Sequence, residues 1–332
     1  MKRFSLRQFS LRQWLGRAGR DRKARGRRPT PATRSAARHS AARNSAAGRS
    51  AAGRSAAGRS AAHHLAARGF EGLEERRMLA IDTWINPAGG NWDVAANWST
   101  GAVPGSGDNV TIDTGATVAT ITIQPGDGIQ VGSLNTTAND TLAITGGSLV
   151  TSGTSTLSGP LDMTGGSLEA DGNLTVNGST TVSQASLDAE NGATLSFPEL
   201  TSTITNGTFT ANGTGSVLDV SALTKVTQQS GWTVNATSGG EVKLTGLTSL
   251  TSTQGISIND TGGGTLLDGN LTSLNGVGVT LDGTDPHVAD SWTKFTSGTL
   301  TVNGNPAGTG YSLPGLTDVD QSSLDAEGGG QL

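Results

Sequence analysis

The sequence predicts an all-β fold, a parallel β-helix or β-solenoid of about nine or ten coils that follows a disordered basic leader. Three observations support this prediction. The chain has 332 residues with 49 glycines and only 4% aromatic residues, which is too few large apolar groups for one thick core. Short apolar motifs repeat along most of the chain, and the charges divide into two opposite pieces. These features favour many small cores stacked along one axis.

The first 80 residues form a basic leader of low complexity. They carry 20 of the 23 Lys and Arg residues but only four of the 27 acidic residues, a net charge of +16, whereas the rest of the chain carries −20. Between Ser35 and Ser60 a serine recurs every five residues. The intervening glycines each disfavour helix by about 1 kcal/mol, and no apolar stripe is present for packing. We therefore expect residues 1–80 to be disordered.

The leader has two interpretations. An arginine-rich tail binds nucleic acid by releasing counterions, so nucleic-acid binding is an alternative function. We favour an export leader and do not expect a nucleic-acid partner, because the tail precedes an acidic, β-patterned body. A standard secretory signal needs an uninterrupted apolar stretch, and Arg7 and Arg12 interrupt the one between Phe4 and Leu15. We expect no transmembrane segment, since no apolar run approaches about 18 residues.

A short motif marks the boundary between leader and body. Residues 69–80 read Gly-Phe-Glu-Gly-Leu-Glu-Glu-Arg-Arg-Met-Leu-Ala. This string resembles the Phe-Glu-x-Leu-Glu-x-Arg motif that opens many planctomycete extracellular proteins, with Met78 in place of the more usual leucine. The resemblance covers about a dozen residues. It implies export to the cell surface or beyond and carries no information about chemistry.

A tryptophan-rich segment, residues 81–115, follows the leader. Trp84, Trp92 and Trp98 occur within 15 residues and are separated by glycine turns. This spacing resembles the segment that begins autotransporter-like and planctomycete β-helical surface proteins. We expect an N-terminal β cap, because flat rings cover a sheet edge that is otherwise free to pair with other chains. The alternative is a platform on which the three rings stack against a glycan.

The first repeated motif in residues 116–332 ends in a polar residue. In order, it consists of an apolar residue, any residue, an apolar residue or alanine, and finally Asn, Asp or Glu. The first copy begins at Leu187 and the last at Leu324, with a mean step of about 23 residues. Upstream, Leu149 and Leu168 end copies of Thr-Gly-Gly-Ser-Leu that are 19 residues apart. The polar residues are expected to stack as a structural ladder of Glu190, Asn212, Asn235, Asn259, Asp282, Asn303 and Glu327.

The second motif is an apolar residue, Thr, any residue and another apolar residue. Clear copies run from Leu223-Thr224 to Leu316-Thr317, with Gly-rich turns between the two motifs. Three short strands and three turns in each step make one solenoid coil, in which alternate side chains point inward. A leucine-rich-repeat-like solenoid is the alternative fold, although Gly- and Thr-rich connections form helix poorly.

The sequence predicts no catalytic or metal centre. After Arg77 the chain has no arginine, and His287 is the only histidine after residue 64, so no histidine pair can form in the body. Lys225 and Lys294 share one position of the second motif, which suggests a repeating surface site. The alternative is a polysaccharide-active β-helix enzyme, a lyase or hydrolase, which a cluster of non-periodic carboxylates in a groove would favour. No cofactor is expected; weak calcium binding is the alternative.

These observations predict a secreted or cell-surface structural or adhesive protein and not an enzyme. The expected partners are cell-surface or matrix polysaccharide and further coils or an anchoring domain of the same protein. The second expectation comes from residues 324–332, which repeat the spacing of residues 187–195 without completing a coil. An incomplete coil leaves strand edges unpaired, so we expect the chain to be a piece of a longer solenoid.

Overall fold

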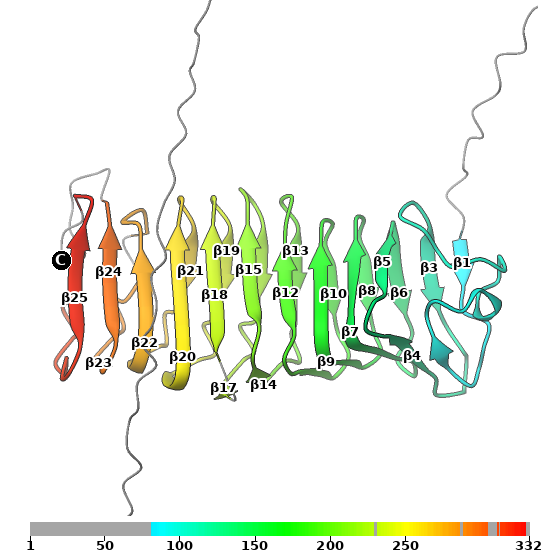
Figure 1. Ribbon diagram of the computed structural model, residues 1–332, viewed down its shortest axis with the longest axis horizontal. Helices are drawn as coiled ribbons and strands as arrows, with labels where there is room; N and C mark the ends of the chain where they lie inside the picture. Colours follow the sequence, from blue (N-terminus) through cyan, green and yellow to red (C-terminus); the bar gives the residue numbers. More distant parts are fainter. Residues whose placement is uncertain (1–80, 229–230, 286–287, 305–310, 312, 330–332) are drawn as a thin grey trace, which may run out of the picture. The chain divides into compact units, whose positions relative to one another are not determined.

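The computed structural model describes residues 81–329 apart from 229–230, 286–287, 305–310 and 312; the leader, and with it the prediction of disorder, lies outside the described residues. The body is a parallel β-solenoid of about ten coils, and Figure 1 shows its strands side by side in sequence order. Every pair of named strands is parallel, and Trp84 and Trp98 form an isolated antiparallel bridge. The predicted fold class is confirmed.

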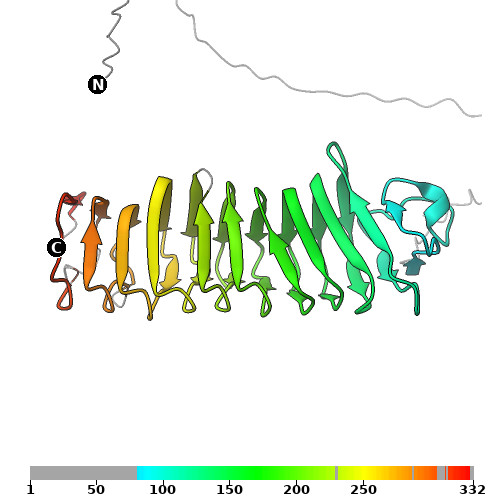
Figure 2. The ribbon, with the colours of Figure 1, turned by 90° about the horizontal axis from the view of Figure 1, so that it is seen from below.

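Two large sheets run along the stack of coils, and Figure 2 shows the strands in two layers, one in front of the other. The narrow sheet has nine strands: β1 (Ile81–Thr83), β3 (Asn109–Ile112), β6 (Ser133–Thr136), β8 (Ser155–Leu157), β10 (Leu174–Val176), β13 (Thr194–Ser196), β16 (Val217–Asp219), β19 (Glu241–Lys243) and β21 (Thr265–Leu267). The main path of the wide sheet is β2 (Gly90–Asn91), β4 (Thr120–Ile123), β7 (Thr141–Thr151), β9 (Leu161–Ala170), β12 (Ser186–Ala189), β15 (Thr208–Asn212), β18 (Trp232–Thr237), β20 (Ser249–Thr261), β22 (Ser273–Leu281), β24 (Thr299–Asn303) and β25 (Ser323–Glu327).

Shorter strands form a third side of each coil. The wide sheet also includes β5 (Gly128–Val131), which pairs with β7, and a separate two-stranded sheet joins β14 (Ser202–Thr205) and β17 (Lys225–Gln228). We call β11 (Thr180–Val182), β14, β17 and β23 (Lys294–Thr296) the third side. The long strands β7, β9, β20 and β22 contribute to both sides, and the pairing of β7 with β9 and of β20 with β22 shifts register between the two parts.

The register of the wide sheet explains the two repeat lengths. Leu149, Leu168 and Leu187 are successive partners, which confirms the 19-residue step. Beyond Leu187 the partners are 21 to 25 residues apart, and the column continues through Phe209, Val234, Ile258, Val279, Leu300 and Leu324. Column members as far as Leu300 are buried, because alternate strand residues point into the core.

The second motif forms a corner between coils. Its first apolar position is buried at Leu223, Leu247 and Leu271. The threonine beside it binds the preceding coil twice: both the backbone N–H and Oγ1 of Thr272 donate to the Thr248 carbonyl oxygen, Oγ1 at 3.1 Å. The same double contact occurs at Thr224, Thr293 and Thr317. Among the described residues the only helical element is a single 3₁₀ turn, η1 (Ala95–Asn97), so the leucine-rich-repeat alternative is wrong.

The two sheets end at different coils. Among the described residues, the last strand of the narrow sheet is β21, whereas the wide sheet continues through β22, β24 and β25. Past β21 the core is completed by loop residues, among them Val288, Ala289 and Tyr311, all buried. The last coils therefore have a different construction from the central ones.

Candidate functional site

The three tryptophans of the N-terminal segment are buried in the core. Trp84, Trp92 and Trp98 are 1%, 0% and 1% exposed, so no ring face is available to stack on a glycan. Trp98 meets both other rings edge to face, with centroids 5.0 Å from Trp84 and 4.7 Å from Trp92. Its indole N–H donates to the Trp92 carbonyl oxygen at 2.7 Å. The rings pack as a core at this end of the solenoid, not as a sugar platform.

The seven polar residues predicted to form one ladder lie in two columns on the outer face of the wide sheet. One column contains Glu190, Asn212, Asp282, Asn303 and Glu327. Asn303 pairs with Glu327 directly, and the other three residues each come directly after a paired residue of a strand. Asn235 and Asn259 pair in the other column, two residues away along the strand. The single column is therefore corrected to two.

The cause of this correction is the register between β15 and β18. Phe209 pairs with Val234, not with Trp232, so Asn212 lies beside Thr237 and Thr210 beside Asn235. Trp232 begins β18 one position before the β15 partner strand starts, and its ring packs edge to face on Phe209 at 5.4 Å. The longer coil thus moves the motif by two residues without changing which side chains point inward.

Side-chain hydrogen bonds connect the polar columns from coil to coil. Asn212 Nδ2 donates to Glu190 Oε2 at 2.9 Å, and Thr237 Oγ1 donates to Asn212 Oδ1 at 3.0 Å. In the other column Asn259 Nδ2 donates to Asn235 Oδ1 at 2.9 Å. These contacts satisfy polar groups within the protein, so the columns support stacking directly.

Four carboxylates gather on adjacent strands at the start of these columns. Glu169 pairs in register with Asp188, and Asp171 and Glu190 follow the paired Ala170 and Ala189. Partial burial, and then the charges of Asp171, Asp188 and Glu190, raise the pKa of Glu169. Burial also raises the pKa of Asp188, against a hydrogen bond with Thr210 that lowers it. This patch gives the wide sheet a negative surface.

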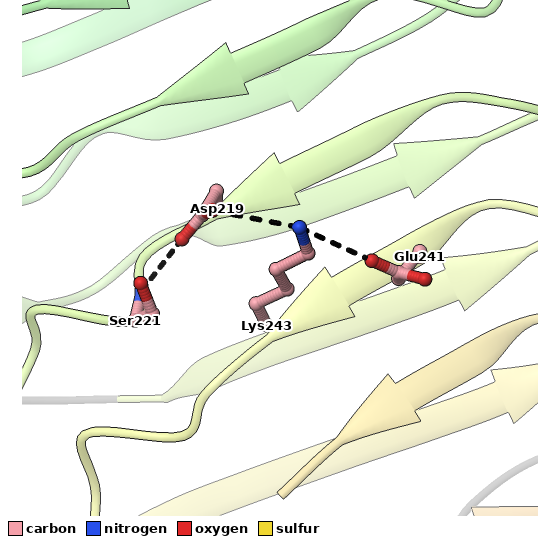
Figure 3. Close-up of polar contacts among 4 residues, drawn as sticks. All are labelled: Asp219, Ser221, Glu241 and Lys243. Atoms are coloured by element: carbon pink, nitrogen blue, oxygen red, sulfur yellow. Dashed lines mark hydrogen bonds and ion pairs between the residues drawn. The ribbon is translucent and has the colours of Figure 1, made fainter.

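The outer face of the narrow sheet carries an ion pair, shown in Figure 3. Lys243 Nζ lies 3.6 Å from Asp219 Oδ2 and 3.5 Å from Glu241 Oε1. Burial alone would raise the pKa of Asp219, but hydrogen bonds from Ser221 and the charge of Lys243 outweigh it and lower the pKa. Lys243 is thus held by carboxylates of its own and the preceding coil.

A shallow groove lies on the third side, between successive coils. Its volume is about 250 Å³, and it is lined by Thr180, Thr181, Val182, Ser202, Thr203, Lys225 and Thr227. Its lining strands stack because Ser202 pairs with Lys225 and Ile204 with Thr227. Lys225 is exposed and makes no ion pair within the described part of the chain. The second motif supplies Lys225 to this groove, although sequence reasoning assigned no binding site to that motif.

Two aspartates occupy inward positions that are apolar in the preceding coils. Asp260 follows Ala211 and Ala236 in one column of the wide sheet. Asp268 takes the place held by Val220 and Leu244 in the two coils before it. Both aspartates are buried. Sequence reasoning missed both of them.

Asp268 has a structural partner. Trp292 Nε1 donates to Asp268 Oδ2 at 2.7 Å. Burial raises the pKa of Asp268 to about 6, although the bond from Trp292 lowers it in part. A hollow of about 220 Å³ adjoins this residue, with Asp285 also in its lining. The Asp285 carboxylate accepts a hydrogen bond from the Leu266 N–H at 3.3 Å, so both carboxylates help to hold the loops in place.

Two searches of the described residues give negative results. Within residues 81–329, outside the gaps given above, no group of three or more His, Cys, Asp and Glu side chains could hold a metal ion. No described helix is long and apolar enough to cross a membrane. Comparison with known proteins finds no matching family model, no matching curated protein and no matching solved structure.

Proposed function

We propose that this chain is a secreted or cell-surface structural or adhesive protein that contacts acidic polysaccharide through the third-side groove. The observation that carries the proposal is the lining of this groove, in which threonine and serine hydroxyls surround one lysine that makes no ion pair with any described residue. The Phe-Glu-x-Leu-Glu-x-Arg motif that resembles planctomycete exported proteins supports an extracellular location, as does the resemblance to autotransporter-like β-helical proteins.

The chemistry of the groove suits a carbohydrate. Hydroxyl groups both donate and accept hydrogen bonds, as sugar hydroxyls do, and the groove follows the stacking direction of the coils. Lys225 supplies a point charge for a uronate carboxylate or a sulfate. The body contains only three lysines, and Lys243 is already held by Asp219 and Glu241, so Lys225 is the cation available at this groove.

Affinity electrophoresis in gels that contain polygalacturonate, with neutral dextran as the reference, tests the proposal; the full chain is compared with a chain that lacks residues 1–68, because the basic leader also attracts polyanions. Lys225→Ala is expected to weaken retardation by about fivefold, the effect of one exposed charge pair. Lys294→Ala is the matched control, because Lys294 is exposed in the same motif position on β23 but does not line the groove. It should change retardation little.

Three outcomes would contradict the proposal. One is an equal loss of retardation in both lysine variants, which would indicate only a general charge effect. Another is no retardation of the unmodified chain in polygalacturonate. The third is release of oligosaccharides from the gel polymer by the purified chain, which would identify a polysaccharide-active enzyme in place of an adhesive protein.

A further inference from the structure

Asp260 is an isolated carboxylic acid inside the solenoid. In its column Ala236 lies on one side and Leu281 on the other. The side chain is 0% exposed, and neither carboxylate oxygen has a hydrogen-bond partner among the described residues. Gly264 leaves room for this group, because a Cβ there would lie 2.8 Å from Asp260 Oδ1. An ionised carboxylate without a partner is costly in such a place.

Among the described residues, the charges that act on Asp260 are those of two further carboxylates, Asp282 and Asp285. Asp282 and Asp285 follow β22, and Tyr311 lies in the buried core. Asp282 is fixed beside the turn after β20, because its Oδ2 accepts from the Gly263 N–H at 2.7 Å. The Tyr311 hydroxyl is also buried without a hydrogen-bond partner in the described part of the chain.

These surroundings favour the neutral acid. Burial, and then the charges of Asp282 and Asp285, raise the pKa of Asp260 from 3.8 to about 8. Burial and the charges of Asp260, Asp285 and Asp282 also raise the pKa of Tyr311, so the phenol stays neutral in the same range. Ionisation of Asp260 would place a negative charge in the buried core, close to the half-buried carboxylates of Asp282 and Asp285.

We propose that Asp260 is a proton-controlled lock on the C-terminal coils: the neutral acid allows β20, β22 and Tyr311 to close the core, and ionisation opens it to water. Opening hydrates Asp260 and separates it from Asp282 and Asp285. The lock acts beside β21, the last strand of the narrow sheet among the described residues.

The direction of the pH effect follows from linkage. The closed form holds its proton up to a pH of about 8, whereas an open, hydrated Asp260 releases it near 3.8. Between these values the closed form binds one more proton, so the opening equilibrium rises about tenfold for each pH unit. Above a pH of about 8 both forms are ionised and the rise stops. Closure is therefore strongest in acid and weakest at alkaline pH.

Hydrogen-exchange mass spectrometry of the full chain from pH 5 to pH 9 tests the lock, after correction for the intrinsic pH dependence of exchange. The opening constant of β20 and β22 should rise about a thousandfold between pH 5 and pH 8 and then level off. Strands β12 and β15, whose inward positions hold Ala189 and Ala211, serve as the internal reference. Their protection should change little.

Four variants decide the assignment. Asp260→Ala, which inserts the residue of the preceding coils, should remove the pH dependence of β20 and β22, and Asp260→Asn provides a second neutral side chain if alanine alters packing. Asp162→Asn, on an exposed residue of β9, is the control and should keep the wild-type profile. A wild-type opening constant that does not change with pH would overturn the proposal, as would a pH dependence that persists in both Asp260 variants. Loss of the pH dependence in Tyr311→Phe would also overturn it, because the transition would then belong to the phenol.

Discussion

The two ends of the described solenoid close their cores in different ways. At the N-terminal end Trp84, Trp92 and Trp98 fill the interior, and two of their three indole N–H groups donate to backbone carbonyls. At the other end the wide sheet outlasts the narrow one, and Leu324, the last member of a buried column, is 40% exposed. Among the described residues, the first coil is therefore filled with aromatic rings, whereas the last strand is exposed.

This difference teaches where the stability of such a fold lies. Each coil gains most of its stability from its neighbours, so a coil with only one neighbour depends on what covers its free side. Large buried rings cover one end, whereas all five residues of β25 are exposed. We expect substitutions at the two ends to differ strongly in cost, and the predictions below test that expectation from the largest effect to the smallest.

Trp98→Ala should have the largest effect. It removes a fully buried ring that contacts both other tryptophans, and truncation of a buried aromatic costs about 3–5 kcal/mol. Urea denaturation followed by circular dichroism measures the change in the free energy of unfolding. A loss below about 1 kcal/mol would show that the rings do not hold the N-terminal end.

Asp268→Ala should have an intermediate effect, near the end of the narrow sheet. It leaves the indole N–H of Trp292 buried without its acceptor, which costs about 1–3 kcal/mol. The double variant Asp268→Ala with Trp292→Phe should recover part of the loss in the same denaturation experiment, because it removes the stranded donor. No recovery would mean that the Asp268–Trp292 bond is not the cause.

Asn259→Ala should destabilise the middle of the stack by about 1 kcal/mol. It removes the amide that donates to Asn235 Oδ1, a half-buried hydrogen bond between coils. Asn270→Ala is a suitable control, since Asn270 is exposed and its amide binds a turn carbonyl. Equal losses in the two variants would show that the polar column adds nothing specific to stacking.

Leu324→Ala should have the smallest effect, within about 0.5 kcal/mol, because its side chain already meets solvent. The matched substitution is Leu187→Ala, at a fully buried member of the same column. It should lower the free energy of unfolding by about 2–5 kcal/mol. Similar costs at both positions would mean that Leu324 is covered in solution, and would remove the contrast between the ends.

The sequence predicted the coil but not every column. The repeats around Leu149, Leu168 and Leu187 set the 19-residue step correctly, because equal motifs at equal spacing share one environment. The motifs at Phe209 and Trp232 look equivalent but lie two residues apart in register. A shift by two keeps the inward and outward faces unchanged, so alternation alone cannot detect it.

The inward aspartates were missed for a related reason. The motif ends at the polar residue Asn259 and therefore does not include Asp260. Continued alternation from Ile256 and Ile258 places Asp260 inward, so the signal was present. The groove around Lys225 could not be found in this way, because its shape depends on how three strands of different coils bend together.

The parallel stacking also has a mechanical consequence. Adjacent coils are joined by hydrogen bonds that run along the axis, so a pulling force applied to the two ends loads one interface after another and unravels the chain turn by turn. Each coil that unfolds adds the extended length of its residues to the chain, at about 3.4 Å per residue. This is about 65 Å for a 19-residue coil and about 80 Å for a 24-residue coil. Under tension the chain would lengthen in discrete steps. The length of each step would change near Leu187, where the repeat length changes.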